Sequence, residues 1–249
     1  MNIPIVMLHH VANSPHATLK KWSIGHKKFL ELLNCIEERG FKTTTFREIT
    51  EQGWKQSDFA NKIVLTFDDC PISLFDFAIP ELLKRKMKAV FYIPTDQIDG
   101  LNTWDIDELG TIPVSLMNAE QLIYLQSNGM EIGSHGEKHI RLTEASNELA
   151  FAEISNSKQV LTDLLGSRVY SFAYPYGKVP KRHQKMLKQS GYNFGISIYS
   201  PFETKFSLRR FAIHDTDDIK KIRFKLSKRY HIMRYIYDPI FLLKKRFFV

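Results

Sequence analysis

The amino-acid sequence predicts one α/β domain in which parallel strands alternate with helices. Short apolar segments rich in Val, Ile, Phe and Tyr alternate along the chain with longer segments of helical apolar spacing. No internal repeat, low-complexity tract or Gly/Ser linker marks a second domain. The chain has 249 residues, of which 43% are hydrophobic, so it is long enough to bury one large core. Its strands could close into a barrel or lie in an open doubly wound sheet.

The first predicted strand and helix are followed by several similar pairs. Residues 3–11, IPIVMLHHV, are predicted to form a buried strand, and the apolar spacing of residues 26–40 predicts a helix that ends at Gly40. Residues 99–117 are expected to form an inserted loop that borders a site. Further strands are expected over residues 62–69, 88–94, 130–135, 169–175 and 192–198. Further helices are expected over residues 77–86, 118–129, 144–166 and 181–191.

Composition limits the compartment in which the protein is expected. The two cysteines, Cys35 and Cys70, provide neither a disulfide framework nor the spacing of a zinc finger, which suits a reducing compartment. No stretch approaches about 18 uninterrupted apolar residues, so no membrane-spanning segment is predicted. The N-terminal residues MNIPIVMLHH lack the basic region, apolar region and cleavage site of a secretory signal. We therefore expect a cytoplasmic protein.

The net charge of +8 is concentrated near the C-terminus. Residues 220–249 contain ten Lys and Arg residues against one Asp, so the rest of the chain is close to neutral. Aromatic and aliphatic residues interleave these charges. We predict a domain over residues 1–215 and a basic, aromatic-rich helical tail over residues 216–249, which either packs its apolar side on the domain or lies on anionic lipid. No recognised binding motif or Gly-rich loop supports nucleic-acid binding.

Two adjacent carboxylates, Asp68 and Asp69, directly follow the predicted strand IVLTF. Their repulsion and desolvation are costly at the end of a buried strand unless a cation or shared proton chemistry compensates. His135 and His139 follow a later strand, and the two imidazoles can bind one metal ion if the segment turns helically. With one aspartate they form a two-His, one-carboxylate set, which leaves positions for water and substrate. The other aspartate is then free to act as a base.

The segments around these residues resemble the polysaccharide deacetylase family, which is also called carbohydrate esterase family 4 or the NodB-like deacetylases. The resemblance runs from about residue 5 to about residue 214, with the order of motifs intact. It implies a distorted, incomplete (β/α) barrel of the NodB-like type. The segments that carry the resemblance are LTFDDC, EIGSHGEKHIRL, EISNSKQVLTDLLGSRVYSFAYPYG and SGYNFGIS.

The resemblance implies roles for the carboxylates and histidines. Asp68 corresponds to the catalytic base of the family. Asp69, His135 and His139 correspond to its metal ligands, with zinc as the default metal. The implied reaction is hydrolysis of an N-acetyl amide on a sugar or glycan, in which Asp68 takes a proton from water and the metal stabilises the oxyanion.

The segment AYPYG resembles the family's third motif. Tyr174, Pro175 and Tyr176 are therefore expected to line the substrate groove, and the backbone near Tyr174 is expected to help stabilise the oxyanion. Bacterial surface-polysaccharide assembly is the expected setting. Two alternatives remain open: a deformylase that acts on a lipid-linked aminosugar, and an inactive carbohydrate-binding homologue.

Three departures from the family pattern affect the expected site. Cys70 stands where the family usually has Gly, so the turn after the aspartates must avoid a conformation that Gly favours or accept strain. The third motif lacks the Arg that orients the base in many members, so that Arg must come from elsewhere or be absent. The final Leu-x-His motif supplies the general acid in the family, and Ile213-His214 is the nearest candidate here.

Three further residues have two interpretations each. Strand alternation sends His9 and His10 to opposite faces, so at most one of them is expected to point into a site. The one that points inward could equally be a buried core histidine. Trp104 could shape the rim of the pocket or anchor a packed loop.

Overall fold

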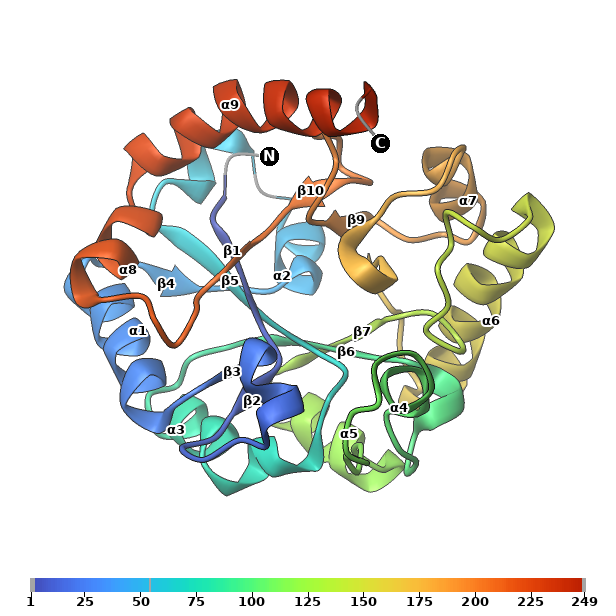
Figure 1. Cartoon of the computed structure of the whole chain (residues 1–249), viewed down its shortest axis with the longest axis horizontal. Helices are drawn as coiled ribbons and strands as arrows, with labels where there is room; N and C mark the ends of the chain where they lie inside the picture. The colour runs from blue at the N-terminus through green and yellow to red at the C-terminus, as the bar shows by residue number, and fades with distance from the viewer. Residues whose placement is uncertain (1–2, 54, 248–249) are drawn as a thin grey trace.

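A nearly closed, mostly parallel β-barrel with helices around it forms the centre of the molecule (Figure 1). The computed structural model describes residues 3–53 and 55–247. The strand order is β10-β9-β8-β7-β6-β5-β1-β11, with β4 added beside β5, and the predicted single-domain α/β barrel is confirmed. The strands are β1 (Ile5–Leu8), β4 (Lys42–Thr43), β5 (Lys62–Asp68), β6 (Val90–Ile93), β7 (Glu131–Ser134), β8 (Ser171–Ala173), β9 (Phe194–Ser197), β10 (Leu208–Arg209) and β11 (Phe211–Ala212). A separate pair joins β2 (His10–Val11) to β3 (Ser23–Ile24).

One short segment joins the two edges of this sheet. β10 pairs with β9, where Leu208 lies opposite Ile196. Two residues later β11 pairs with β1, where Phe211 lies opposite Val6. Arg210 lies between the two short strands, and its side chain is buried. The segment therefore nearly closes the barrel and places a cationic side chain at the point of closure.

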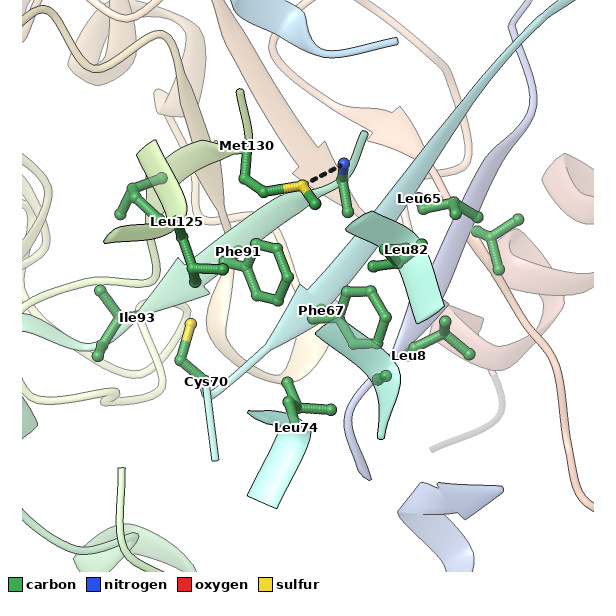
Figure 2. Close-up of a cluster of buried hydrophobic side chains, with 14 of the residues drawn as sticks. Leu8, Leu65, Phe67, Cys70, Leu74, Leu82, Phe91, Ile93, Leu125 and Met130 are labelled. Carbon is green, nitrogen blue, oxygen red and sulfur yellow. Dashed lines mark hydrogen bonds between the residues drawn. The ribbon is translucent and has the colours of Figure 1, made fainter. Parts of the chain in front are cut away.

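Apolar residues on alternating positions bury both faces of the strands, as expected for a parallel sheet that is covered on both sides. One cluster lies where β5 and β6 pack with helices α3 (Ala78–Lys84) and α5 (Ala119–Ser127), and it includes Leu65, Phe67, Leu82, Phe91 and Leu125 (Figure 2). The alternate side chains, Val64 of β5 and Val90 of β6, belong to a second cluster on the barrel side of the sheet. Phe46 of α2 joins this second cluster and so helps to fill the barrel.

The helices begin and end close to the predicted positions. Asn118 accepts a hydrogen bond from the Gln121 N–H at the start of α5, and Ser146 accepts one from the Leu149 N–H at the start of α6. Gly166 ends α6 in the left-handed conformation. The helices are α1 (His26–Glu38), α2 (Phe46–Glu51), α3 (Ala78–Lys84), α4 (Thr103–Leu109), α5 (Ala119–Ser127), α6 (Asn147–Leu165), α7 (His183–Gln189), α8 (Ile219–Lys225) and α9 (Lys228–Phe247).

The inserted segment 99–117 contains more structure than the expected loop. It forms α4, which is flanked by antiparallel bridges between Leu101 and Ser115 and between Pro71 and Leu116. The first bridge lies within the insertion, and the second ties it to the chain just after Asp69. The segment is therefore a folded wall beside the carboxylates.

The basic tail contains two helices that differ in their burial. Ile222 lies in α8 and Leu226 directly follows that helix, and both side chains are buried in the core. Arg223 of α8 donates a hydrogen bond to Glu38 of α1 at 2.9 Å. α9 instead exposes several large apolar side chains, among them Ile232 and Tyr235. No helix in residues 3–53 and 55–247 combines the length and apolar character needed to cross a bilayer.

Candidate active site

The site forms where β5 and β7 end at the same edge of the sheet. Asp68 is the last residue of β5, and Asp69 follows it. His135 directly follows β7, which is separated from β5 by β6 alone. Because the carboxyl ends of parallel strands meet at one edge, residues far apart in the sequence converge there.

Three buried side chains form a candidate metal site. The ligand atoms of Asp69, His135 and His139 all lie within 4.8 Å of one another. Asp69 Oδ1 is 3.7 Å from His135 Nε2 and 3.6 Å from His139 Nε2. His135 Nδ1 donates to the Ala173 carbonyl at 2.8 Å, which fixes the tautomer that leaves Nε2 free to bind a metal.

The electrostatics of Asp69 fit a bound cation. Its Oδ1 is buried and has no hydrogen-bond partner among the residues that the structure describes. Burial and the adjacent Asp68 carboxylate raise the pKa of Asp69 well above its usual range. A divalent ion between Asp69 and the two imidazoles would satisfy the orphaned oxygen and compensate the buried charge. The donor set of one carboxylate and two imidazoles is one that zinc accepts.

The loop that carries His139 is shaped by a buried carboxylate, not by the helical turn that the spacing predicts. His139 has a φ of 60°. The peptide N–H groups of the two preceding residues, Glu137 and Lys138, both donate to Glu153 Oε2 at 3.0 Å. Gly136 has a φ of 86°, and a Cβ there would lie 3.2 Å from the same Glu153 oxygen. Glu153 of α6 thus holds the loop in a conformation that a helix would not give.

Asp68 is held by a bidentate ion pair. Arg210 Nη1 donates to Asp68 Oδ1 at 2.5 Å, and Nη2 donates to Oδ2 at 2.6 Å. Nη1 also donates to Thr66 Oγ1 at 3.1 Å. Burial alone would raise the pKa of Asp68, but the charges of Arg210 and His135 hold it below its usual range. Asp68 is therefore an ionised, oriented carboxylate beside the candidate metal site.

Arg210 pairs with Asp68, the predicted base, and it comes from outside the third motif, which lacks an arginine. It comes from the segment SLRRFAI, where the sequence indicated only a structural strand. The available signal was a charged pair inside an otherwise apolar strand segment, because a buried arginine requires an acidic partner.

His9 also approaches Asp68, the predicted base. Its Nε2 lies 3.9 Å from Asp68 Oδ2, and its ring contacts Trp22 at a centroid distance of 5.0 Å. Burial lowers the pKa of His9 to about 3, so the ring is neutral near pH 7. His10 lines the same cavity as His9, because the first strand ends at Leu8 and strict alternation does not extend to these two residues.

Two aromatic side chains flank His139, a member of the candidate metal site. The rings of Trp104 and Tyr176 lie 4.4 Å and 4.9 Å from its ring, and the Arg141 guanidinium stacks on Tyr176 at 3.8 Å. Trp104 is only 8% exposed, so its ring packs against His139 and does not form an exposed rim. These residues border an open groove of about 570 Å³, which we call the metal-side groove.

The expected role of Tyr174 as a groove residue is wrong for its side chain. β8 ends at Ala173, and the next side chain turns into the core, where the Tyr174 hydroxyl donates to the Phe206 carbonyl at 2.8 Å. Its ring is fully buried, and its peptide N–H donates to the Ile196 carbonyl at 2.9 Å. Pro175 is also buried. Of the three residues, Tyr176 is the one that borders the metal-side groove.

Cys70 accepts the strained conformation instead of avoiding it. Asp69 and Cys70 have φ values of 66° and 54°, which cost about 1–3 kcal/mol each for residues other than Gly. The Cys70 side chain is fully buried in the apolar cluster near Leu74 and Ile93 (Figure 2). Cys70 and Cys35 are both unpaired thiols. Strain at the candidate ligand Asp69 is typical of functional sites.

His214 lies outside the metal cluster. Its side chain is exposed and lines a cavity together with His9 and Arg210, both of which contact Asp68. Its peptide N–H donates to Asp217 at 3.0 Å, which fixes the backbone after β11. The structure therefore brings His214 into a cavity that two neighbours of Asp68 also line.

Comparison with known families identifies the class of protein that this barrel and site define. A model of the family described as polysaccharide deacetylase matches residues 55–195, which is more than half of the chain. The chain therefore belongs to the polysaccharide deacetylase family, and the resemblance inferred from the motifs is confirmed.

Relatives with established names are distant in sequence. YxkH of Bacillus subtilis, which is provisionally named as a polysaccharide deacetylase, is 22% identical over 196 residues, 78% of this chain and 64% of that protein. This chain thus spans less than two thirds of that relative. Poly-beta-1,6-N-acetyl-D-glucosamine N-deacetylase of Staphylococcus aureus is 20% identical over 202 residues, 79% of this chain and 70% of that protein.

Solved structures show the same fold at low identity. The Streptococcus pyogenes deacetylase PplD in complex with acetate aligns with a TM-score of 0.73 and 22% identity, and the alignment covers 90% of this chain and 98% of that one. IcaB from Ammonifex degensii aligns with a TM-score of 0.70 and 19% identity over 89% of this chain and 96% of that one. These likenesses establish the fold.

Proposed function

We propose that the protein is a metal-dependent N-deacetylase that acts on an N-acetylated sugar or glycan. The observation that carries this proposal is the convergence of a buried two-His, one-Asp set beside Asp68, a carboxylate that Arg210 holds in place. The Staphylococcus aureus relative is named for removal of acetyl groups from poly-N-acetylglucosamine, which supports the same reaction class here. Bacterial surface-polysaccharide assembly remains the setting that we propose for it.

The residues around the site can perform amide hydrolysis. A zinc ion held by Asp69, His135 and His139 would supply Lewis acidity toward the amide carbonyl and the attacking water. Asp68 takes the proton from that water, since Arg210 keeps the carboxylate ionised and fixed in orientation. His214 is proposed as the acid that protonates the leaving amine.

The oxyanion donor is assigned by elimination along the third motif. The Tyr174 N–H is bonded to the Ile196 carbonyl, and Pro175 has no N–H. The next peptide donor is that of Tyr176, whose φ of 57° lies in the left-handed region. We assign this N–H to the developing oxyanion, in place of a donor at Tyr174.

Acetate release tests the proposed reaction. The purified protein with added zinc is expected to release acetate from N-acetylglucosamine oligomers, whereas Asp68→Asn should lower the rate by at least about a hundredfold. Glu120→Gln, on the exposed surface of α5, is the control and should retain the wild-type rate. Formate release from an N-formyl aminosugar, without acetate release from any acetylated sugar, would favour the deformylase alternative. Sugar binding without either product would favour the inactive homologue.

The outer face of α9 supports peripheral contact with anionic lipid. Ile232, Tyr235 and Ile236 are 60%, 61% and 56% exposed, and their spacing places them on one face of the helix. Ten basic residues in residues 220–249 add electrostatic attraction to an anionic surface. We therefore propose that the protein acts at the cytoplasmic face of a membrane, and we expect no nucleic-acid binding.

A further inference from the structure

Helix α4 of the inserted segment contacts the chain beside the candidate metal site. Trp104 and Glu108 are four residues apart on this helix, so they lie on one face of it. The Trp104 ring lies 4.4 Å from the ring of His139, and Glu108 Oε2 accepts a hydrogen bond from Arg141 Nη2 at 2.5 Å. One face of the insertion therefore reaches both His139 and the arginine two residues after it.

Arg141 also joins α4 to the third motif. Its guanidinium lies 3.8 Å from the centre of the Tyr176 ring, which is the arrangement of a cation–π contact. The Glu108 carboxylate is close enough to the hydroxyl of the same tyrosine to interact with it electrostatically. Glu108, Arg141 and Tyr176 thus form one group, which we call the clamp. Its members come from the insertion, from the loop after β7 and from the segment after β8.

Main-chain hydrogen bonds anchor the insertion that carries Glu108. The Met117 N–H donates to the Cys70 carbonyl at 3.0 Å, and the Ile72 N–H donates to the Ser115 carbonyl at 2.9 Å. These contacts lie directly after the two adjacent carboxylates in the sequence. The clamp therefore connects the third motif, through α4, to the chain segment that supplies the proposed base.

The conformation of Tyr176 requires support from its surroundings. Its φ of 57° costs about 1–3 kcal/mol, and such a conformation persists only where neighbouring groups fix it. The chain after it is held through the backbone, because the Gly177 carbonyl accepts the Ile198 N–H at 3.0 Å. The Tyr176 side chain is held by Arg141 and by the His139 ring, whose centroid lies 4.9 Å away. The side-chain contacts therefore help to set the direction of the Tyr176 peptide.

The contacts of Arg141 favour a positioning role over direct binding of substrate. One nitrogen donates to Glu108, and the guanidinium covers the Tyr176 ring, so its charge is compensated and part of its surface is occupied. Arg141 is 30% exposed and Glu108 is 41% exposed. A partly exposed ion pair adds little to global stability, so its main effect is on local geometry.

We propose that Arg141 and Glu108 are positioning residues that hold the Tyr176 side chain so that its peptide N–H points at the developing oxyanion. This inference rests on the proposed deacetylase function, in which that N–H stabilises the oxyanion. An oxyanion donor acts mainly in the transition state. Its displacement should therefore lower kcat and leave KM nearly unchanged.

The kinetics of Arg141→Ala test the clamp. With zinc and N-acetylglucosamine oligomers, kcat for acetate release should fall about tenfold to a hundredfold, while KM stays within about twofold of the wild-type value. The zinc content should equal that of wild type. Arg168→Ala is the matched control, because it removes a guanidinium that lies 5.4 Å from the Tyr170 ring at the other end of β8. This control should keep the wild-type kcat.

Two variants of Glu108 test the clamp from its other partner. Glu108→Ala should lower kcat as Arg141→Ala does. Glu108→Gln should recover most of the rate, because its amide oxygen can still accept from Arg141. Should Arg141→Ala fail to fold, Glu108→Ala carries the same prediction, since it alters a side chain that is 41% exposed.

Three results would overturn the clamp. Wild-type kcat in Arg141→Ala, or in Glu108→Ala, would show that Tyr176 needs no such support. A raised KM with unchanged kcat would make Arg141 a substrate-binding residue. A parallel loss of zinc and of kcat would make it a support of the metal-site loop. Failure of wild type to release acetate would instead refute the underlying function, so the two failures are distinguishable.

Discussion

Arg210 and Asp68 form a buried ion pair whose partners come from distant parts of the chain. The side chain of Arg210 is 1% exposed and that of Asp68 is 3% exposed. Removal of one partner from such a pair leaves an uncompensated buried charge, which costs far more than the loss of a surface pair. The same contact orients the proposed base and joins the closing segment to β5.

Arg210→Met should destabilise the protein strongly. The uncompensated Asp68 carboxylate is expected to reduce the free energy of unfolding by about 3–5 kcal/mol. Arg223→Met is the matched control: it breaks the exposed pair with Glu38, in which both side chains are 55% exposed, and should change the stability far less, because solvent screens an exposed pair. Urea denaturation measures both values, and equal losses in the two variants would refute the distinction.

The buried carboxyl group of Glu131 is expected to lower the stability of the protein as the pH rises from mildly acidic to neutral. Burial raises the pKa of Glu131 to about 7 from the 4.5 of the exposed group. Between these values the folded state holds a proton that the unfolded state has lost, so stability falls as the pH rises from 4.5 to 7. Below that window both states are protonated, and above it the folded state carries the full cost of the buried charge.

Glu131→Gln should remove this dependence. Gln retains an oxygen that can accept the Arg47 N–H, which Glu131 Oε2 accepts at 2.7 Å in the native protein. Wild type should lose about 2–3 kcal/mol more of its free energy of unfolding between pH 4.5 and pH 8 than Glu131→Gln does. Denaturant titrations across this pH range measure the effect. Parallel pH profiles for the two proteins would contradict it.

At the scale of elements, the loop after β7 depends on a single acceptor from α6. Glu153 is 1% exposed, and one of its oxygens accepts two adjacent peptide N–H groups of the segment that places His139. Without that acceptor, the N–H groups would have to seek water, and the left-handed conformation at His139 would lose its support. Glu153 is therefore proposed as a positioning residue for the candidate metal site.

Glu153→Ala should weaken metal binding, and Glu153→Gln should restore much of it. The amide oxygen of Gln can still accept from the Glu137 and Lys138 N–H groups, whereas Ala cannot. We expect zinc affinity to fall by about tenfold to a hundredfold in the Ala variant, as measured by competition with a chelator. Equal affinities in the Ala variant and wild type would show that the loop holds His139 unaided.

The elements that the sequence predicts well have strong local signals. The strands around residues 62–69 and 130–135 are short apolar segments, and the α5 helix begins at an Asn with Gln three residues later. α4 was missed because an insertion without an apolar stripe gives little local signal. The paired roles of Arg210 and Glu153 were missed because each depends on a partner that only the tertiary fold brings near. Tyr174 was misassigned because the motif does not show where β8 ends.

At the scale of the whole molecule, one short segment and one helix meet beside the proposed base. The closing segment carries Arg210 into the barrel, where Arg210 pairs with Asp68 and lines a cavity that helix α9 also borders. α9 lines that cavity with one face and exposes apolar side chains on another. The proposed division of the chain at residue 215 would assign both faces of α9 to the tail.

Vesicle binding tests the outer face of α9. The triple variant Ile232→Ser, Tyr235→Ser, Ile236→Ser should lose most of its co-sedimentation with vesicles that contain anionic phosphatidylglycerol, because apolar burial in the interface is removed. Vesicles of neutral phosphatidylcholine should bind wild type weakly, since the basic residues then lack a partner. Equal co-sedimentation of the triple variant and wild type with anionic vesicles would contradict contact through this face.

The most direct test of the central claim is the metal content of the purified protein after exposure to zinc, measured by elemental analysis. Wild type should retain about one zinc ion per chain, and both His135→Ala and Asp69→Asn should lose it. His16→Ala is the control, since His16 is exposed and its ring hydrogen-bonds to the neighbouring Thr18, and it should retain the wild-type content. Absence of bound metal in wild type, or its retention in both ligand variants, would contradict the proposed metal site.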